Sequence, residues 1–165
     1  MRIALAAALV LGLAAPALAE DDESLVTYQS LKPELAIDLA KAAMEFCREQ
    51  GYQVGVSVVD RSGTLQTFMR DRYAGSHTVE TATRKAWTAV SFRTNTTDLD
   101  PVTQPGGDAY GIRFISKALP LGGGIMIESG GTMVGAVGVS GAPGPHLDDE
   151  CAEAGIAAIE DQLGF

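Results

Sequence analysis

The sequence has 165 residues, a formal net charge of -9 at pH 7 and a pI near 4.6, with 46% hydrophobic and 20% charged residues. This length favours one domain, and the hydrophobic share is typical of a chain that buries a core. Proteins that hold nucleic acid need a basic face to neutralise phosphates, so the acidic balance argues against a nucleic-acid partner.

Residues 1–19 have the features of a secretory signal peptide. Arg2 supplies a positive start, Ile3 to Leu13 is an apolar run too short to span a membrane, and Ala17-Leu18-Ala19 has the small-residue pattern of a cleavage site. We therefore expect cleavage after Ala19, export to the periplasm or the cell exterior, and one domain over residues 20–165. No membrane span is expected in that domain, because no second apolar run approaches spanning length.

The next segment predicts a helix followed by a hairpin. Apolar residues recur with helical spacing from Pro33, which suits a first helical turn, to the break at Gly51. Residues 54–59 are mostly β-branched and lead into the turn Asp60-Arg61-Ser62-Gly63, after which residues 64–70 alternate in pattern. Two such runs around a turn are typical of a β-hairpin.

The central part predicts a second helix and then an irregular segment. Ser76 is a suitable N-cap for a helix that ends at about Phe92. From Thr94 to Leu119, two prolines and Gly106-Gly107 interrupt any regular pattern and leave a short helix over residues 97–100. A segment of this kind inside a compact domain is usually functional.

The C-terminal part predicts a second hairpin and a last helix. Residues 125–128 and 133–140 have strand composition around Ser129-Gly130-Gly131, and Asp148 is a suitable N-cap for a helix that ends at Leu163. The order of elements lacks parallel β-α-β alternation. We therefore predict an α/β domain of the α+β type, with an antiparallel sheet flanked by helices.

Glycines are frequent in and beside the last predicted strand. Gly135, Gly138 and Gly141 mark a bulge or the close approach of another group. A flat ligand on this surface is one interpretation. A helix or a second subunit packed closely on it is the other, and it is the favoured one. Because the side chains of this hairpin are small and a partner would cover them, we expect a homo-oligomer larger than a dimer.

Six motifs along the chain resemble the GlcG/HbpS family of haem-binding proteins. They are Val58-Val59-Asp60-Arg61-Ser62-Gly63, Met69-Arg70, Arg84-Lys85-Ala86-Trp87-Thr88-Ala89, Pro120-Leu121-Gly122-Gly123-Gly124, Val134-Gly135-Ala136-Val137-Gly138-Val139-Ser140-Gly141 and Asp148-Asp149-Glu150-Cys151-Ala152-Glu153-Ala154-Gly155. The resemblance implies a profilin-like sandwich with a five-stranded antiparallel sheet, a homo-oligomer, and binding of haem or a related tetrapyrrole. A related domain forms the C-terminus of some corrinoid adenosyltransferases. The fifth strand is then expected between Ile112 and Leu119.

Haem needs an apolar slot, usually an axial donor to the iron, and cations for its two propionates. The chain has two histidines, His77 and His146. His77 lies at a loop edge, near Arg70, Arg72 and Arg84 in sequence, so it is the first candidate for the metal ligand. Arg70 and Arg84 are the candidate cofactor-binding residues. His146 is the second candidate. The alternative for His77 is a solvent-facing side chain.

Other residues are weaker candidates. Tyr110 and Tyr73 are possible oxygen ligands, although packing is the commoner role of a tyrosine. Gly122, Gly123 and Gly124 present consecutive N–H groups that suit an anion nest for a propionate or a small carboxylate, with a structural turn as the alternative. Nucleotide binding is excluded, because this motif lacks the lysine and hydroxyl residue of a phosphate loop and leads into a strand.

Two cysteines, Cys47 and Cys151, occur without zinc spacing, so neither a zinc site nor covalent haem attachment is expected. In an exported protein the two predict a disulfide. Small residues share a helical face with each cysteine, which lets the first and last helices approach closely. They are Ala36, Ala40 and Ala43 on the first helix, and Ala154, Gly155 and Ala158 on the last. Two buried free thiols are the alternative.

Two functional hypotheses follow. The first is an exported haem-binding protein for haem capture, storage or sensing. The alternative is an enzyme or carrier that acts on a small organic acid or a corrinoid at the glycine-rich face. No catalytic residue is assigned, since Ser140 does not fit a hydrolase elbow and the aspartates are better explained as turn and cap residues. A binding protein is therefore favoured over a catalyst.

Overall fold

The computed structural model describes residues 24–164, and the expected signal peptide at residues 1–19 lies outside the described residues. The elements are α1 (Pro33–Glu49), β1 (Gly55–Asp60), β2 (Leu65–Arg70), α2 (Thr78–Phe92), α3 (Thr96–Val102), the 3-10 helix η1 (Tyr110–Phe114), β3 (Gly124–Ser129), β4 (Thr132–Ser140), α4 (Pro145–Ala157) and α5 (Glu160–Leu163). Between residues 24 and 164, no helix is both long and apolar enough to cross a membrane.

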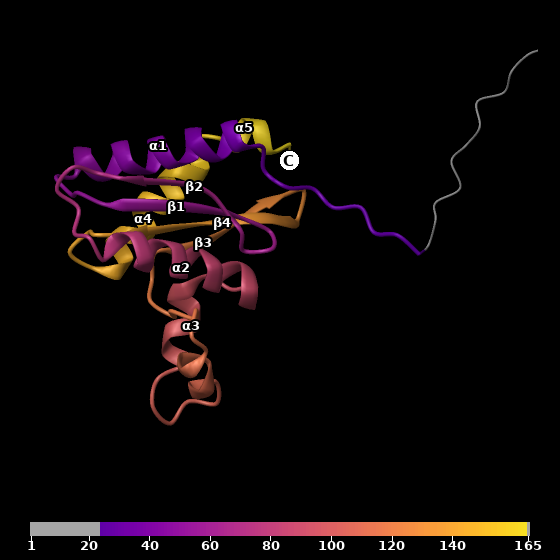
Figure 1. Cartoon of the computed structure of the whole chain (residues 1–165), viewed down its shortest axis with the longest axis vertical. Helices are drawn as coiled ribbons and strands as arrows, with labels where there is room; N and C mark the ends of the chain where they lie inside the picture. The colour runs from indigo at the N-terminus through magenta and orange to yellow at the C-terminus, as the bar shows by residue number, and fades with distance from the viewer. Residues whose placement is uncertain (1–23, 165) are drawn as a thin grey trace, which may run out of the picture.

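The strands form one antiparallel sheet in the order β2-β1-β4-β3, with helices on both faces. Helices α1 and α4 pack together on one face, and α2 packs on the other (Figure 1). Strand β1 is buried along nearly its whole length because both of its faces are covered. Val56 and Val58 belong to the core under α1 and α4, whereas Val59 belongs to the smaller core under α2. The predicted α+β class and both hairpins are confirmed.

The expected fifth strand between Ile112 and Leu119 is wrong, since the described sheet has four strands and the 3-10 helix η1 occupies part of that segment. The outer edge of β3 is closed by side chains instead. The N–H of Gly124 donates to Thr96 Oγ1 at 2.8 Å, and the N–H of Met126 donates to Asn95 Oδ1 at 3.0 Å. These bonds take the place of a neighbouring strand, which protects the edge.

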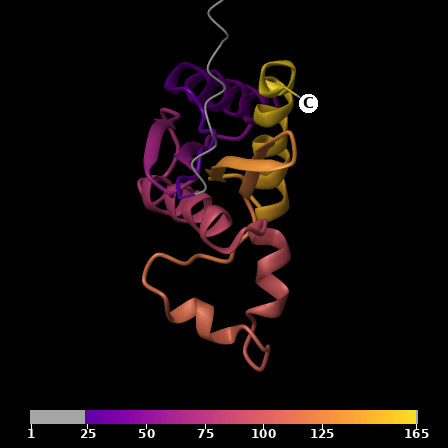
Figure 2. The ribbon, with the colours of Figure 1, turned by 90° about the vertical axis from the view of Figure 1, so that its right-hand side faces the viewer.

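The segment between α2 and β3 forms an arm that projects away from the sheet and carries α3 and η1 (Figure 2). Helix α3 contains the short helix predicted over residues 97–100. Several large apolar side chains of the arm are exposed, among them Phe114 at 73% and Val102 at 49%. The arm therefore contributes little of its apolar surface to the core of the domain.

Two predicted helix starts need correction. Helix α2 begins at Thr78, and no side chain caps it, so Ser76 is not the N-cap. Helix α4 begins at Pro145 after Gly144, three residues before Asp148, and it ends at Ala157 instead of continuing to Leu163. Proline suits a first helical turn because it lacks an N–H. The Asp148 carboxylate does not cap the helix, because it forms a buried ion pair with Lys85.

Helix packing explains two glycines of the sheet, Gly138 of β4 and Gly124 of β3. A Cβ on Gly138 would fall on the carbonyl oxygen of Ala82 and lie 2.7 Å from the nitrogen of Ala86, both in α2. A Cβ on Gly124 would lie 2.5 Å from the carbonyl oxygen of Lys85. Side chains at these positions would push α2 off the sheet. The packing interpretation is confirmed at Gly138, where α2 covers the surface. At Gly135 and Gly141 the close neighbours are backbone groups outside α2, since a Cβ would lie 2.5 Å from the carbonyl oxygen of Val59 and 2.6 Å from that of Gln53.

The predicted disulfide between Cys47 and Cys151 is present and joins α1 to α4, with the two Cα atoms 5.5 Å apart. Both cysteines are fully buried. Close approach of the helices depends on Gly155, where a Cβ would lie 2.8 Å from the Cβ of Ala43. Ala158, expected on the same face as Cys151, follows the end of α4 and is exposed.

A charged pair ties the end of α1 to the loop after β2. The Arg48 guanidinium donates to both carboxylate oxygens of Asp71, at 2.5 and 3.2 Å, and the N–H of Arg72 donates to the same carboxylate. Asp71 is only 2% exposed. The hydrogen bond from Arg48 holds the pKa of Asp71 below its ordinary value. The ionised form is therefore the one that the fold favours.

Asp71 should make stability depend on pH in the acid range. Because its pKa is lower in the folded state, its contribution is complete above the ordinary value of 3.8 and disappears as pH falls from there through the folded value. In the wild type, the free energy of unfolding should fall as pH drops below about 4, and in Asp71→Asn it should fall less steeply. Urea unfolding at several pH values measures both slopes. Asp38→Asn, at an exposed position of α1, is the control. A wild-type slope in Asp71→Asn would contradict the assignment.

Candidate functional site

His77 and Arg70 lie close to each other in the chain, on either side of the loop between β2 and α2. His77 occupies the N-cap position of α2, is exposed, and has its ring beside Gly75. No hydrogen bond or ion pair engages its imidazole within residues 24–164. Arg70 ends β2 and donates to the carbonyl oxygen of Ala74 at 2.5 Å, which leaves its other N–H groups free. This loop therefore offers an accessible imidazole with an arginine nearby.

Arg84 is committed to the base of the arm. It lies on α2 seven residues after His77 and donates to the carbonyl oxygens of Lys117 and Ala118, at 3.3 and 2.8 Å. It also pairs with Glu80 one turn earlier, at 3.2 Å. Its three bonds fasten the returning chain to α2. Arg84 is thus available to a ligand only if some of these contacts are shared.

Tyr110 and His146 belong to other elements than the His77 loop, whereas Tyr73 lies within it. Tyr110 belongs to η1 in the arm, where it stacks edge-on against Phe114 with ring centroids 5.1 Å apart. His146 is exposed in the first turn of α4, with its ring beside Gly144. Tyr73 lies in the loop before α2 and is 81% exposed. The structure therefore does not gather the predicted residues around a single cavity.

The turn Gly122-Gly123-Gly124 is an internal junction. The N–H of Gly123 donates to Asp149 Oδ1, and the N–H of Gly124 is bonded to Thr96 as described above. Asp149 also accepts a hydrogen bond from Thr97. The chain's own groups therefore satisfy two of the three N–H groups considered for an anion nest. This geometry favours the structural turn over the nest.

A buried ion pair lies beside this turn, and the sequence interpretation did not identify it. The ammonium group of Lys85 donates to Asp148 Oδ2 at 2.7 Å and to the carbonyl oxygen of Val139 at 3.0 Å, and the lysine is 1% exposed. Burial raises the pKa of Asp148, and the attraction of Lys85 offsets part of that effect. One signal for the pair was available: Lys85 follows Ala82 by three residues, on the apolar face of α2.

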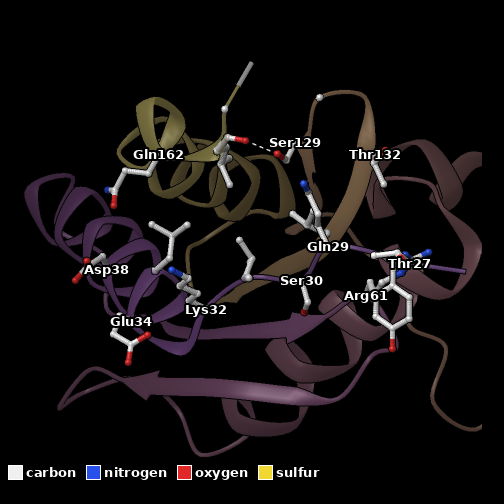
Figure 3. Close-up of a pocket in the computed structure, with 17 residues that line it drawn as sticks. Thr27, Gln29, Ser30, Lys32, Glu34, Asp38, Arg61, Ser129, Thr132 and Gln162 are labelled. Carbon is white, nitrogen blue, oxygen red and sulfur yellow. Dashed lines mark hydrogen bonds between the residues drawn. The ribbon is translucent and has the colours of Figure 1, made fainter. Parts of the chain in front are cut away.

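A large cavity lies near the start of the described chain, at the end of the sheet where β1 finishes (Figure 3). Its volume is about 950 Å³. Residues 27–32, the start of α1, the turn between β3 and β4, and residues 162–164 enclose it. Its charged residues are Lys32, Glu34, Asp38 and Arg61. No local sequence pattern marks this cavity, because segments from both ends of the domain form it.

A second hollow of about 410 Å³ lies between β3 and α4, with Met126 and Ile156 in its lining and glutamates around them. Neither cavity is lined by any of the residues predicted to bind haem. Within residues 24–164, no group of three or more His, Cys, Asp or Glu side chains is arranged to hold a metal ion. A bare metal centre therefore has no support in the described part of the chain.

Comparison with known proteins relates the chain to haem-binding and corrinoid proteins. It is 37% identical over 123 residues to the corrinoid adenosyltransferase PduO of Salmonella typhimurium. The matched region covers 73% of this chain and 36% of that protein. The chain thus spans about a third of the length of such relatives.

Solved structures give the same relationship. The crystal structure of HbpS matches with a TM-score of 0.78 and 35% identity, over 86% of this chain and 99% of that chain. The crystal structure of a PduOC:heme complex matches with a TM-score of 0.74 and 35% identity, over 79% of this chain and 95% of that chain. Residues 31–157 match the family described as haem degrading protein HbpS-like. The chain therefore belongs to the HbpS-like family.

Proposed function

We propose that this chain is an exported haem-binding protein that captures, stores or senses haem. The observation that carries the proposal is its likeness, at 35% identity, to a structure that was solved as a haem complex. The HbpS-like family match over residues 31–157 supports it. A binding role is preferred to catalysis, because the hydroxyl of Ser140, the serine considered for a hydrolase elbow, accepts a hydrogen bond from Thr81 instead of meeting a base.

In this proposal His77 would hold the haem iron through its imidazole, and the loop before α2 would form part of the site. Its imidazole is exposed and has no partner among the described residues, so a ring nitrogen is available to iron. Arg70 has free N–H groups for a propionate, and Arg84 contributes if it shares its contacts with the arm. Bound haem would supply the redox-active iron. These residues would hold and orient the haem through its iron and its propionates.

Titration of the purified protein with hemin tests the proposal. We expect a shifted Soret band with a stoichiometric end point, and His77→Ala should move the band and weaken affinity about tenfold or more, equal to about 1.4 kcal/mol. Circular dichroism should stay unchanged, because the side chain is exposed. His146→Ala is the matched control and should behave like the wild type. A wild-type spectrum in His77→Ala contradicts the ligand assignment, and the absence of any hemin binding contradicts the function.

Export and self-association belong to the same proposal. The Cys47–Cys151 disulfide supports an oxidising compartment such as the periplasm. The apolar side chains exposed on the arm support a homo-oligomer larger than a dimer. The mass of the protein recovered from the periplasm should correspond to a chain that starts at Glu20, and light scattering should give several times that mass. A periplasmic chain that starts at Met1 would contradict the predicted cleavage. A mass equal to that of one chain would contradict the homo-oligomer.

The alternative function is action on a corrinoid or a small organic acid, and the likeness to PduO is the observation that favours it. Its expected location at the glycine-rich face has little support, because α2 covers Gly138 and Gly124. Haem binding is therefore the better proposal. Tighter binding of cobalamin than of hemin would reverse this order.

A further inference from the structure

The large cavity and the His77 loop lie at opposite ends of the sheet. Arg70 pairs with Gly55 at the start of β1, whereas Arg61 follows directly after the end of β1 at Asp60. A strand of this length extends about 20 Å at about 3.3 Å per residue. The cavity is thus a separate place on the molecule and requires its own explanation.

The cavity has an apolar floor. Leu31, Val134 and Leu163 contribute to its lining and are nearly inaccessible to solvent, with exposures of 6%, 3% and 6%. Leu35 of α1 adds to them and is partly buried. A volume of about 950 Å³ is at the upper end of the usual range for small-molecule sites, about 300 to 1,000 Å³. An extended or flat apolar molecule can therefore be accommodated.

Hydrogen bonds hold two walls of the cavity in place. Gln66 of β2 donates from Nε2 to the carbonyl oxygen of Leu31 at 2.9 Å, which fixes the N-terminal segment to the sheet. Ser129, at the end of β3, donates to the carbonyl oxygen of Leu163 and fixes the C-terminal end (dashed line in Figure 3). A ligand would thus meet walls that are already in place.

One end of the cavity is cationic. The guanidinium carbon of Arg61 lies 4.5 Å from the centre of the Tyr28 ring, a stack that orients the side chain. Neither Arg61 nor Lys32 forms an ion pair with any residue between 24 and 164. The carboxylates of Glu34 and Asp38 lie on the α1 side, away from Arg61 (Figure 3). An anionic group therefore fits at the Arg61 end.

We propose that this cavity binds an amphiphilic carboxylate, whose acid group pairs with Arg61 and whose apolar body contacts the leucine and valine floor. The planar guanidinium is suited to bidentate pairing with a carboxylate. Such ligands include porphyrins, through their propionates, and long-chain fatty acids. The inference goes beyond the proposed function, since it needs neither iron nor His77.

Two fluorescent probes test the proposal on the protein that starts at Glu20: iron-free protoporphyrin IX and cis-parinaric acid. We expect saturable binding of at least one, and about tenfold weaker binding to Arg61→Gln, equal to about 1.4 kcal/mol. Arg93→Gln, an exposed arginine that follows α2 and does not line the cavity, is the matched control and should bind like the wild type. The methyl ester of the bound probe should bind wild type and Arg61→Gln equally weakly, because it lacks the charge.

Thr132→Trp is a second variant, since a bulky ring at this exposed rim position should fill part of the cavity and weaken binding. The proposal is overturned if neither probe binds, or if both Arg61→Gln and Thr132→Trp bind like the wild type. Hemin titrations keep the two proposals apart. A Soret shift that is lost in His77→Ala and kept in Arg61→Gln supports separate sites. If the Soret shift is instead lost in Arg61→Gln and kept in His77→Ala, haem binds in the cavity. That result would contradict the His77 assignment and would support carboxylate recognition by Arg61.

Discussion

Asp148→Ala is expected to lower the free energy of unfolding by about 3 to 5 kcal/mol, because it leaves the Lys85 ammonium buried without its partner. Lys85 is 1% exposed, so bulk solvent does not hydrate its ammonium group in the folded protein. The N–H of Ala142, which donates to the other carboxylate oxygen at 2.9 Å, also loses its acceptor. Unfolding in urea, followed by circular dichroism, measures the effect.

A double variant separates the loss of the pair from the cost of an unpaired charge. Asp148→Ala combined with Lys85→Met removes both charges, and it should recover part of the stability that Asp148→Ala loses. Lys85→Met alone should be less damaging at pH 5 than at pH 8, because burial raises the pKa of Asp148 and the remaining carboxyl can become neutral by binding a proton. Unchanged stability in Asp148→Ala, or a double variant as unstable as the single one, would contradict this account.

Removal of the disulfide should have an effect of similar size. Cys47 and Cys151 are separated by 104 positions, and closing a loop of this length stabilises the folded state by about 4 to 5 kcal/mol in the chain-entropy model. This is an upper figure, because engineered and native bonds often contribute less. The double variant Cys47→Ala with Cys151→Ala should therefore unfold at a lower guanidinium concentration.

The control for this experiment is the wild type unfolded in the presence of reductant, which should approach the behaviour of the double variant. Thiol titration of the denatured, unreduced protein purified from the periplasm gives an independent answer. We expect no free thiols and a mass two units below that of the reduced chain. Two free thiols per chain, or equal stability of wild type and double variant without reductant, would contradict the stabilising role of the bond.

Local sequence patterns predicted the elements well where neighbouring residues decide the structure. Helix α1 begins at Pro33 as expected, and both hairpins turn at the predicted glycine-containing segments. Helix starts were less predictable. Asp148 has the chemistry of an N-cap, but Pro145 begins the helix and the carboxylate turns to Lys85 instead. A capping residue can serve another partner, and only the tertiary structure shows which one it serves.

The functional residues were predictable only in part. The accessibility of His77 follows from its place at the edge of a loop, and the structure agrees. The commitment of Arg84 to carbonyl groups more than 30 residues away has no local signature. The cavity with Arg61 has none either, since it forms where residues 27–32 meet residues 162–164.

By itself the sequence determined helices α1 and α2, both hairpins and their antiparallel pairing, because hydrophobic periodicity and turn residues act over short distances along the chain. The six motifs predicted the family by resemblance, and the two cysteines on small-residue helical faces predicted the Cys47–Cys151 bond. The tertiary structure alone decided the number of strands, since Asn95 and Thr96 close the edge of β3 from outside the sheet. It also decided the partner of Lys85 and the walls of the cavity. Such contacts depend on how distant segments meet in space, and single-sequence patterns do not record that.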